Sequence, residues 1–200
     1  MARLIDGDRL TIERDCRVLD PASVGDPVLR GVIEKIERAD TKVVLLQVTC
    51  GLAVPTYWTI LLNRRPFAEI STFNAGCGTH LDSTVALSRA LSEAVQSRLT
   101  MIHGSRDDIV MKPVYAGQVA GGPQVADGRA FRYFDSLAPS ARAEESPDSG
   151  DLSTAMETVL SLLARAGHER VYRVDLRCPV APFAVVKVIA PTLQFRSALF

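Results

Sequence analysis

Residues 76–108 read GCGTHLDSTVALSRALSEAVQSRLTMIHGSRDD, and this stretch decides the fold of the chain. From Asp82 to about Ile102 the apolar side chains recur with the period of an α-helix. At about 100° per residue, five of them share one side of that helix: Leu87, Ala90, Leu91, Ala94 and Val95. The pattern predicts one continuous helix, capped by Asp82 or Ser83 and packed on a sheet.

The opposite side of this predicted helix is polar. Glu93 and Gln96 stand one turn apart on it, so both side chains can address one ligand. A carboxylate and an amide oxygen suit Mg²⁺, and arginine suits phosphate. A solvated helix face with an ordinary ion pair between Arg89 and Glu93 is the alternative interpretation. Arg98 falls among the apolar side chains, where it can snorkel near the helix end.

The flanking segments predict a mixed fold. Upstream, the Asp26–Pro27 pair starts a helix at 28–38, and strands follow at 43–48, 56–62 and 68–75, the last entering a glycine turn. Residues 104–150, rich in glycine and proline, predict a long loop-rich excursion. A helix from 151 ending at Gly167 and strands at 171–176 and 183–189 close the chain. This order predicts an α+β fold: a mostly antiparallel sheet with helices packed on one face.

The composition limits the classes of binding partner and the cellular location that we expect for this chain. Lys plus Arg and Asp plus Glu are 23 each, so no net field attracts nucleic acid or an anionic membrane. The first residues lack the apolar stretch of a signal peptide, and the cytoplasm is the expected location. Four well-separated cysteines and three histidines favour buried free thiols over a zinc site.

Residues 76–108 resemble the signature of the YcaO family, which has a glycine-rich turn with His and Asp, a helix of the form ALxRALxEAxQSR, and G-x-R-D-D. Leu81 replaces the usual proline of the turn. Residues 48–62, VTCGLAVPTYWTILL, resemble the strand–glycine–strand hairpin of the family, and residues 171–195 resemble its closing strands. The resemblance covers nearly the whole chain.

Members of this family use ATP and Mg²⁺ to activate a backbone amide of a peptide. A Cys, Ser or Thr side chain as nucleophile gives an azoline, and external sulfide gives a thioamide. The resemblance therefore implies ATP and Mg²⁺ as cofactors and a peptide or ribosomal protein as substrate. It implies ATP and Mg²⁺ contacts by Glu13, Arg14, Glu93, Gln96 and Arg98, with Glu13, Glu93 and Gln96 in one cleft as the Mg²⁺ ligands. It also offers a second account of Arg98, turned inward toward phosphate or a buried carboxylate.

The match departs from the family in three places. A full YcaO domain is about twice this long, so residues 1–200 resemble a single partial domain, the C-terminal half. The motif I-E-R-D survives at 12–15, but Leu10 stands where the family has a further glutamate. The end of the chain has no proline-rich tail, which favours thioamide over azoline formation.

Three hypotheses follow. The chain is a component of ATP-dependent backbone modification, or an accessory in thiomethylation of a ribosomal protein, completed by a complementary half, a partner protein or a second copy. Alternatively, it is a degenerate half that binds a peptide or partner without catalysis, or a remnant without function. Whether it is an enzyme stays open, and no catalytic residue is assigned.

Overall fold

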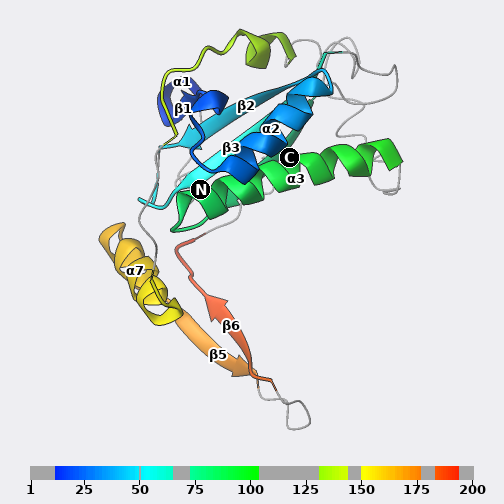
Figure 1. Cartoon of the computed structure of the whole chain (residues 1–200). Helices are drawn as coiled ribbons and strands as arrows, with labels where there is room; N and C mark the ends of the chain where they lie inside the picture. Colours follow the sequence, from blue (N-terminus) through cyan, green and yellow to red (C-terminus); the bar gives the residue numbers. More distant parts are fainter. Residues whose placement is uncertain are drawn as a thin grey trace, which may run out of the picture. The chain divides into compact units, whose positions relative to one another are not determined.

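A computed structural model describes residues 12–49, 51–64, 73–103, 131–143, 150–176 and 183–193. These residues belong to two compact units. The larger holds the elements from α1 to α3, and the smaller holds α7, β5 and β6 (Figure 1). Both combine helix with antiparallel strands, so the predicted α+β class is confirmed.

The larger unit is built on a four-stranded antiparallel sheet in the order β1-β2-β3-β4. Its strands are β1 (Cys16–Leu19), β2 (Thr41–Val48), β3 (Thr56–Asn63) and β4 (Phe73–Thr79). The predictions at 43–48 and 56–62 are confirmed by β2 and β3. The sequence analysis does not predict the short helix α1 (Ile12–Asp15) or the strand β1 that follows it.

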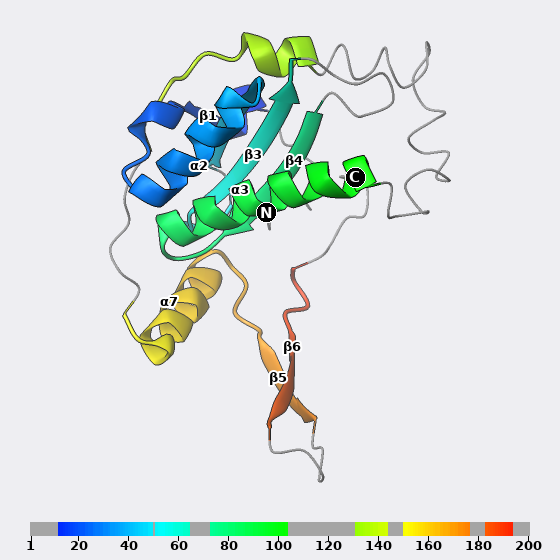
Figure 2. The same cartoon turned by 45° about the vertical axis from the view of Figure 1, so that its right-hand side comes forward.

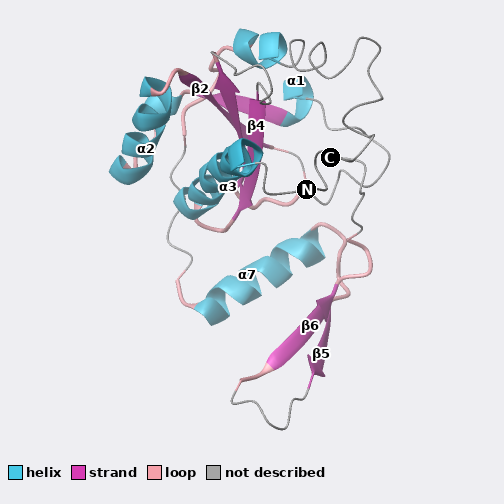
Figure 3. Ribbon diagram, turned by 90° about the vertical axis from the view of Figure 1, so that its right-hand side faces the viewer, coloured by secondary structure: helices cyan, strands magenta, loops and turns pink. Residues whose placement is uncertain are grey.

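Two helices cover one face of this sheet (Figure 3). After a 3-10 turn, η2 (Pro21–Ser23), helix α2 (Pro27–Arg38) begins at the Asp26 cap, whose carboxylate accepts the Leu29 N–H at 2.8 Å. Helix α3 (Ser83–His103) is continuous, as predicted. Apolar side chains of α2 and α3 meet alternate residues of β2 and β3 in one cluster, which includes Leu29, Ile33, Leu45, Leu61 and Leu91.

The other face of the sheet has its own apolar cluster around Phe134. Residues 131–136 form a helical turn whose Phe134 packs edge-on against Trp58, with ring centroids 6.3 Å apart. Part of the predicted 104–150 excursion is therefore a helical turn, and it packs on the sheet face opposite α2 and α3. Residues 104–130 and 144–149 lie outside the described residues.

The closest packing in the larger unit is between α3 and β4. Gly76 and Gly78 lie inside β4, not in a turn after a strand as predicted. A Cβ atom on Gly76 would overlap the backbone of Ala90 and Ala94, and one on Gly78 would overlap the backbone of Ala86 and Ala90. The G-C-G sequence is thus required because the helix backbone occupies the space of a side chain.

The smaller unit holds helix α7 (Leu152–Arg165), capped by Asp151, and a hairpin of β5 (Tyr172–Leu176) with β6 (Val185–Ile189). All three predicted elements are confirmed. Of the predicted apolar stripe of α7, only Leu163 is buried, while Leu152, Met156, Val159 and Leu160 are exposed. No helix in the described part of the chain is long and apolar enough to cross a membrane.

The glycine requirement gives a stability prediction. Gly76→Ala forces the α3 and β4 backbones apart, and we expect it to lower the free energy of unfolding by about 3 kcal/mol or more. Gly31→Ala is the matched control: Gly31 lies within α2 and a Cβ there meets nothing within 4 Å. That change should raise stability by about 0.5–1 kcal/mol through helix propensity. Urea unfolding measures both, and equal effects would contradict the packing.

Candidate functional site

The polar side of α3 lies along the outer edge of β4. The Glu93 carboxylate accepts the Cys77 N–H at 2.9 Å, and Arg89 donates to the Thr79 carbonyl at 3.4 Å. Figure 2 shows β3 on one side of β4. Both contacts therefore lie on the opposite, outer edge of β4. Arg89 and Glu93 therefore hold the strand backbone, and the described contacts include no ion pair between the two side chains.

Glu93 and Gln96 belong to one exposed strip of α3. Both side chains are exposed, and three residues separate them along the helix, so they point to the same side. Thr100 continues this strip and donates to the Gln96 carbonyl at 2.9 Å. The strip thus offers one carboxylate and one amide oxygen beside Arg89, at the border of the sheet.

The negative charge of Glu93 is felt by the neighbouring thiol. Burial raises the pKa of Cys77 to about 11, and the Glu93 carboxylate adds to this effect. The thiol is therefore protonated at neutral pH, which is unsuited to a nucleophile. Cys16 and Cys77 are free, in agreement with the prediction of free thiols, but both are only half-buried. Cys50 and Cys178 lie outside the described residues.

Part of the Arg98 guanidinium is shielded from solvent. Its Nη1 atom is buried and has no hydrogen-bond partner among the described residues. The same is true of Nδ2 of Asn74 and Oγ1 of Thr59. Gly76 faces Ala90 and Ala94 of α3. Asn74 is two residues away from Gly76 in β4 and therefore points to the same face of the sheet. Asn74 thus lies opposite the next turn of α3, the turn that contains Arg98. Each unsatisfied donor costs about 1–3 kcal/mol, so these atoms favour a nearby acceptor such as an anionic oxygen.

Glu13 lies elsewhere. Its neighbour Ile12 packs in the cluster around Phe134, on the sheet face opposite α3. The Tyr133 hydroxyl donates to Glu13, and this hydrogen bond lowers the pKa of the Glu13 carboxyl below its usual value. The structure therefore does not bring Glu13 into one cleft with Glu93 and Gln96. Sequence spacing could not reveal this, because it carries no information on which sheet face each helix covers.

Arg14 is engaged beside Glu13. Its guanidinium forms two hydrogen bonds of 2.9 Å with the carboxylate of the buried residue Asp15. This fork-to-fork pairing occupies the geometry that would otherwise bind a phosphate. Tyr133, which the sequence gave no reason to single out, contacts α1 through Glu13, and Thr49 also holds this helix by donating its N–H to the Asp15 carbonyl at 2.8 Å.

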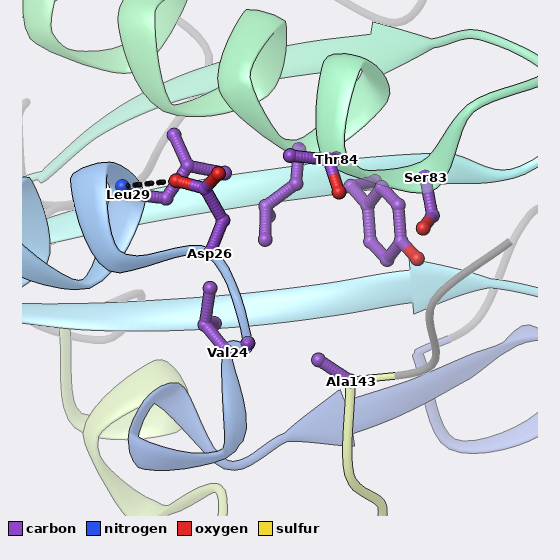
Figure 4. Close-up of a pocket in the computed structure, with 9 residues that line it drawn as sticks. Val24, Asp26, Leu29, Ser83, Thr84 and Ala143 are labelled. Carbon is purple, nitrogen blue, oxygen red and sulfur yellow. Dashed lines mark hydrogen bonds between the residues drawn. The ribbon is translucent and has the colours of Figure 1, made fainter. Parts of the chain in front are cut away.

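A small pocket lies at the other end of α3. It is formed by the starts of α2 and α3, with Val24, Asp26, Ser83, Thr84 and Ala143 in its lining (Figure 4). Asp26 is already bound to the Leu29 N–H, and none of the predicted site residues lines the pocket. The described residues also contain no cluster of three acidic, histidine or cysteine side chains that could by itself hold a metal ion.

Comparison with known proteins identifies the family. The model of the family described as YcaO cyclodehydratase, ATP- and Mg²⁺-binding, matches residues 8–194. The chain belongs to the YcaO family. This YcaO chain is 34% identical over 190 residues to an uncharacterised protein of the tfuA 3′ region of Rhizobium leguminosarum bv. trifolii, and the match covers 88% of the chain.

Solved structures share the fold. A heterocyclase in complex with substrate and cofactor matches 90% of the YcaO chain with a TM-score of 0.66 and 21% identity, over 23% of its own length. YcaO from Methanopyrus kandleri, bound with AMPPCP and Mg²⁺, matches 87% with a TM-score of 0.62 and 19% identity, over 44% of its length. The chain spans less than half of the Rhizobium protein, 42% of its length.

The hydrogen bond between Tyr133 and Glu13 can be tested by titration. Tyr133→Phe removes the donor that stabilises the carboxylate, so the pKa of Glu13 should rise toward its ordinary value. In the wild type, this hydrogen bond stabilises the folded state at pH values above the ordinary pKa of a glutamate carboxyl. The stabilisation is lost as the pH falls through the lowered pKa of Glu13. Carbon-detected NMR of the glutamate carboxyls measures the shift. An unchanged Glu13 pKa in the variant would exclude the contact.

Proposed function

We propose that this YcaO chain takes part in ATP-dependent modification of a peptide backbone. The observation that carries the proposal is the pair Glu93 and Gln96, exposed one turn apart on α3 beside the edge of β4. Support comes from the family model, described as ATP- and Mg²⁺-binding, and from a relative bound with AMPPCP and Mg²⁺. A heterocyclase of the same fold is bound to substrate and cofactor.

The donor set fits part of a Mg-ATP site. Glu93 and Gln96 would supply two oxygen ligands of the kind that Mg²⁺ prefers. Arg89 lies on the same strip, and Arg98 has a buried Nη1 that lacks an acceptor among the described residues. Arg89 beside the two metal ligands, and Arg98 on the sheet-facing side of the helix, would offset part of the charge of a triphosphate.

When bound, ATP supplies the phosphoryl group that activates an amide oxygen of the peptide. The residues of this chain would then have two tasks: Glu93 and Gln96 would hold the metal, and Arg89 and Arg98 would offset the phosphate charge. The finer reaction we propose is thioamide or azoline formation, with an accessory role in thiomethylation of a ribosomal protein as a related possibility.

The described donors are too few for a complete site. Glu13 lies on the other face of the sheet with its carboxylate on Tyr133, and Arg14 is paired with Asp15. We therefore propose that a complementary YcaO half, a partner protein or a second copy supplies further ligands. The same shortage favours the second candidate function, a non-catalytic half that binds a peptide or a partner.

Calorimetric titration with Mg-ATP tests the assignment. We expect weak binding by the chain alone, and Glu93→Ala should weaken it at least about tenfold because one charge-assisted metal contact is lost. Glu34→Ala, which removes an exposed glutamate of α2, is the matched control and should bind as the wild type does.

Equal binding by Glu93→Ala and wild type would exclude the α3 strip as the nucleotide site. Micromolar binding that disappears in Glu93→Ala would instead indicate that this chain alone carries a working site. In that case the non-catalytic alternative would be rejected.

A further inference from the structure

The two edges of the four-stranded sheet differ in the groups that form hydrogen bonds with them. At β1, the outer edge is paired with backbone: Ser140 N–H donates to the Val18 carbonyl at 2.8 Å, and Asp20 N–H donates to the Ala141 carbonyl at 2.9 Å. This short parallel pairing blocks the edge against further strands. At β4, the described contacts on the outer edge come only from the side chains of Arg89 and Glu93.

Along β4, the backbone N–H and C=O groups of successive residues point alternately toward β3 and toward the outer edge. Gly76 and Gly78 pair with β3, and His80 N–H donates to Pro55, so the even-numbered residues point their backbone groups inward. Ala75, Cys77 and Thr79 therefore direct N–H and C=O groups outward. Only the Cys77 N–H and the Thr79 carbonyl have hydrogen-bond partners among the described residues, and both partners are exposed side chains.

We propose that the outer edge of β4, at Ala75, Cys77 and Thr79, binds an extended peptide segment by strand addition. An incoming carbonyl replaces the Glu93 carboxylate at the Cys77 N–H, and an incoming N–H replaces Arg89 at the Thr79 carbonyl. The Ala75 and Thr79 N–H groups gain partners at the same time. Main-chain hydrogen bonds of this kind supply the affinity in strand-addition complexes.

This binding mode specifies where the peptide of the proposed function would bind, and its functional meaning rests on that proposed function. An added strand lies about 4.8 Å from β4, directly beside the α3 strip. Its arrival releases the Glu93 carboxylate and the Arg89 guanidinium, which are the groups assigned to metal and phosphate. A peptide amide and the nucleotide would thus be bound side by side, and peptide docking would make Glu93 available to the metal.

A peptide strand fits this edge better than a second copy of the chain does. Pairing two copies of β4 antiparallel about Cys77 would bring the two Glu93 carboxylates to one place, and like charges repel there. A peptide carries no such charge, and its carbonyl oxygen replaces the carboxylate oxygen at the Cys77 N–H without leaving that donor unpaired.

Hydrogen exchange at single amides tests the proposal. The probe is a short synthetic peptide of alternating Thr and Val with one central Cys, and its fully N-methylated form is the control. We expect the unmethylated probe to slow exchange of the Ala75 and Thr79 amides about tenfold or more, because each gains a hydrogen bond. Gly76 and Gly78, already paired with β3, should change little.

Two comparisons decide the outcome. Ala75→Pro removes an outward N–H from an edge position, where proline is tolerated, and should weaken probe binding while circular dichroism stays unchanged. Ala75→Val keeps the N–H and should bind the probe. Absence of protection in the wild type, or equal protection by the N-methylated probe, would overturn the proposal. A dimer that Ala75→Pro dissociates would assign the edge to self-pairing instead.

The N-methylated probe keeps this test valid even if Ala75→Pro fails to fold. No nucleotide is present, so the result is independent of the Mg-ATP titration. Loss of the nucleotide assignment would leave the strand-addition result standing, and the reverse holds as well.

Discussion

The architecture of the larger unit depends on how closely the α3 backbone approaches the β4 backbone. This approach is possible only because Gly76 and Gly78 have no Cβ, as the backbone of Ala86, Ala90 and Ala94 fills that space. It places Arg89 and Glu93 within reach of the strand edge. A wider spacing would leave both side chains in solvent and separate the polar strip from the sheet.

Much of this fold could be predicted from the sequence, because local patterns decide local structure. The apolar period of residues 82–102 predicts α3, and the Asp26–Pro27 pair predicts the start of α2. The sequence predicts a turn at G-C-G, whereas these glycines lie inside β4. Glycine serves both in turns and in close backbone packing, so the sequence alone does not distinguish the two. Val95 was assigned to the buried side, yet its exposed fraction is 39%.

The site could be predicted less completely, because it depends on how the faces of the sheet are covered. Helical spacing alone places Glu93 and Gln96 together, and the structure agrees. Whether Glu13 joins them depends on the side of the sheet to which α1 belongs, and no local pattern encodes that. Residues 131–136 decide it by packing on the second face and by supplying Tyr133, which binds Glu13.

The role of Glu93 is the centre of this account. In the free chain its carboxylate protects the β4 edge, an ordinary defence of exposed strands by charged side chains. The same carboxylate is the charged member of the pair that we propose as metal ligands on the α3 strip. Edge protection and metal binding therefore compete for one side chain, and this links the surface proposed for the peptide to the surface proposed for the nucleotide.

Paramagnetic broadening by Mn²⁺-ATP tests the location of the nucleotide most directly, because it detects binding even when affinity is weak. We expect the amide resonances of Cys77, Glu93 and Gln96 to broaden as Mn²⁺-ATP is added. The resonances of Glu13 and Tyr133, on the opposite face of the sheet, should broaden much less. Broadening centred on Glu13 with no effect at Gln96 would contradict the account.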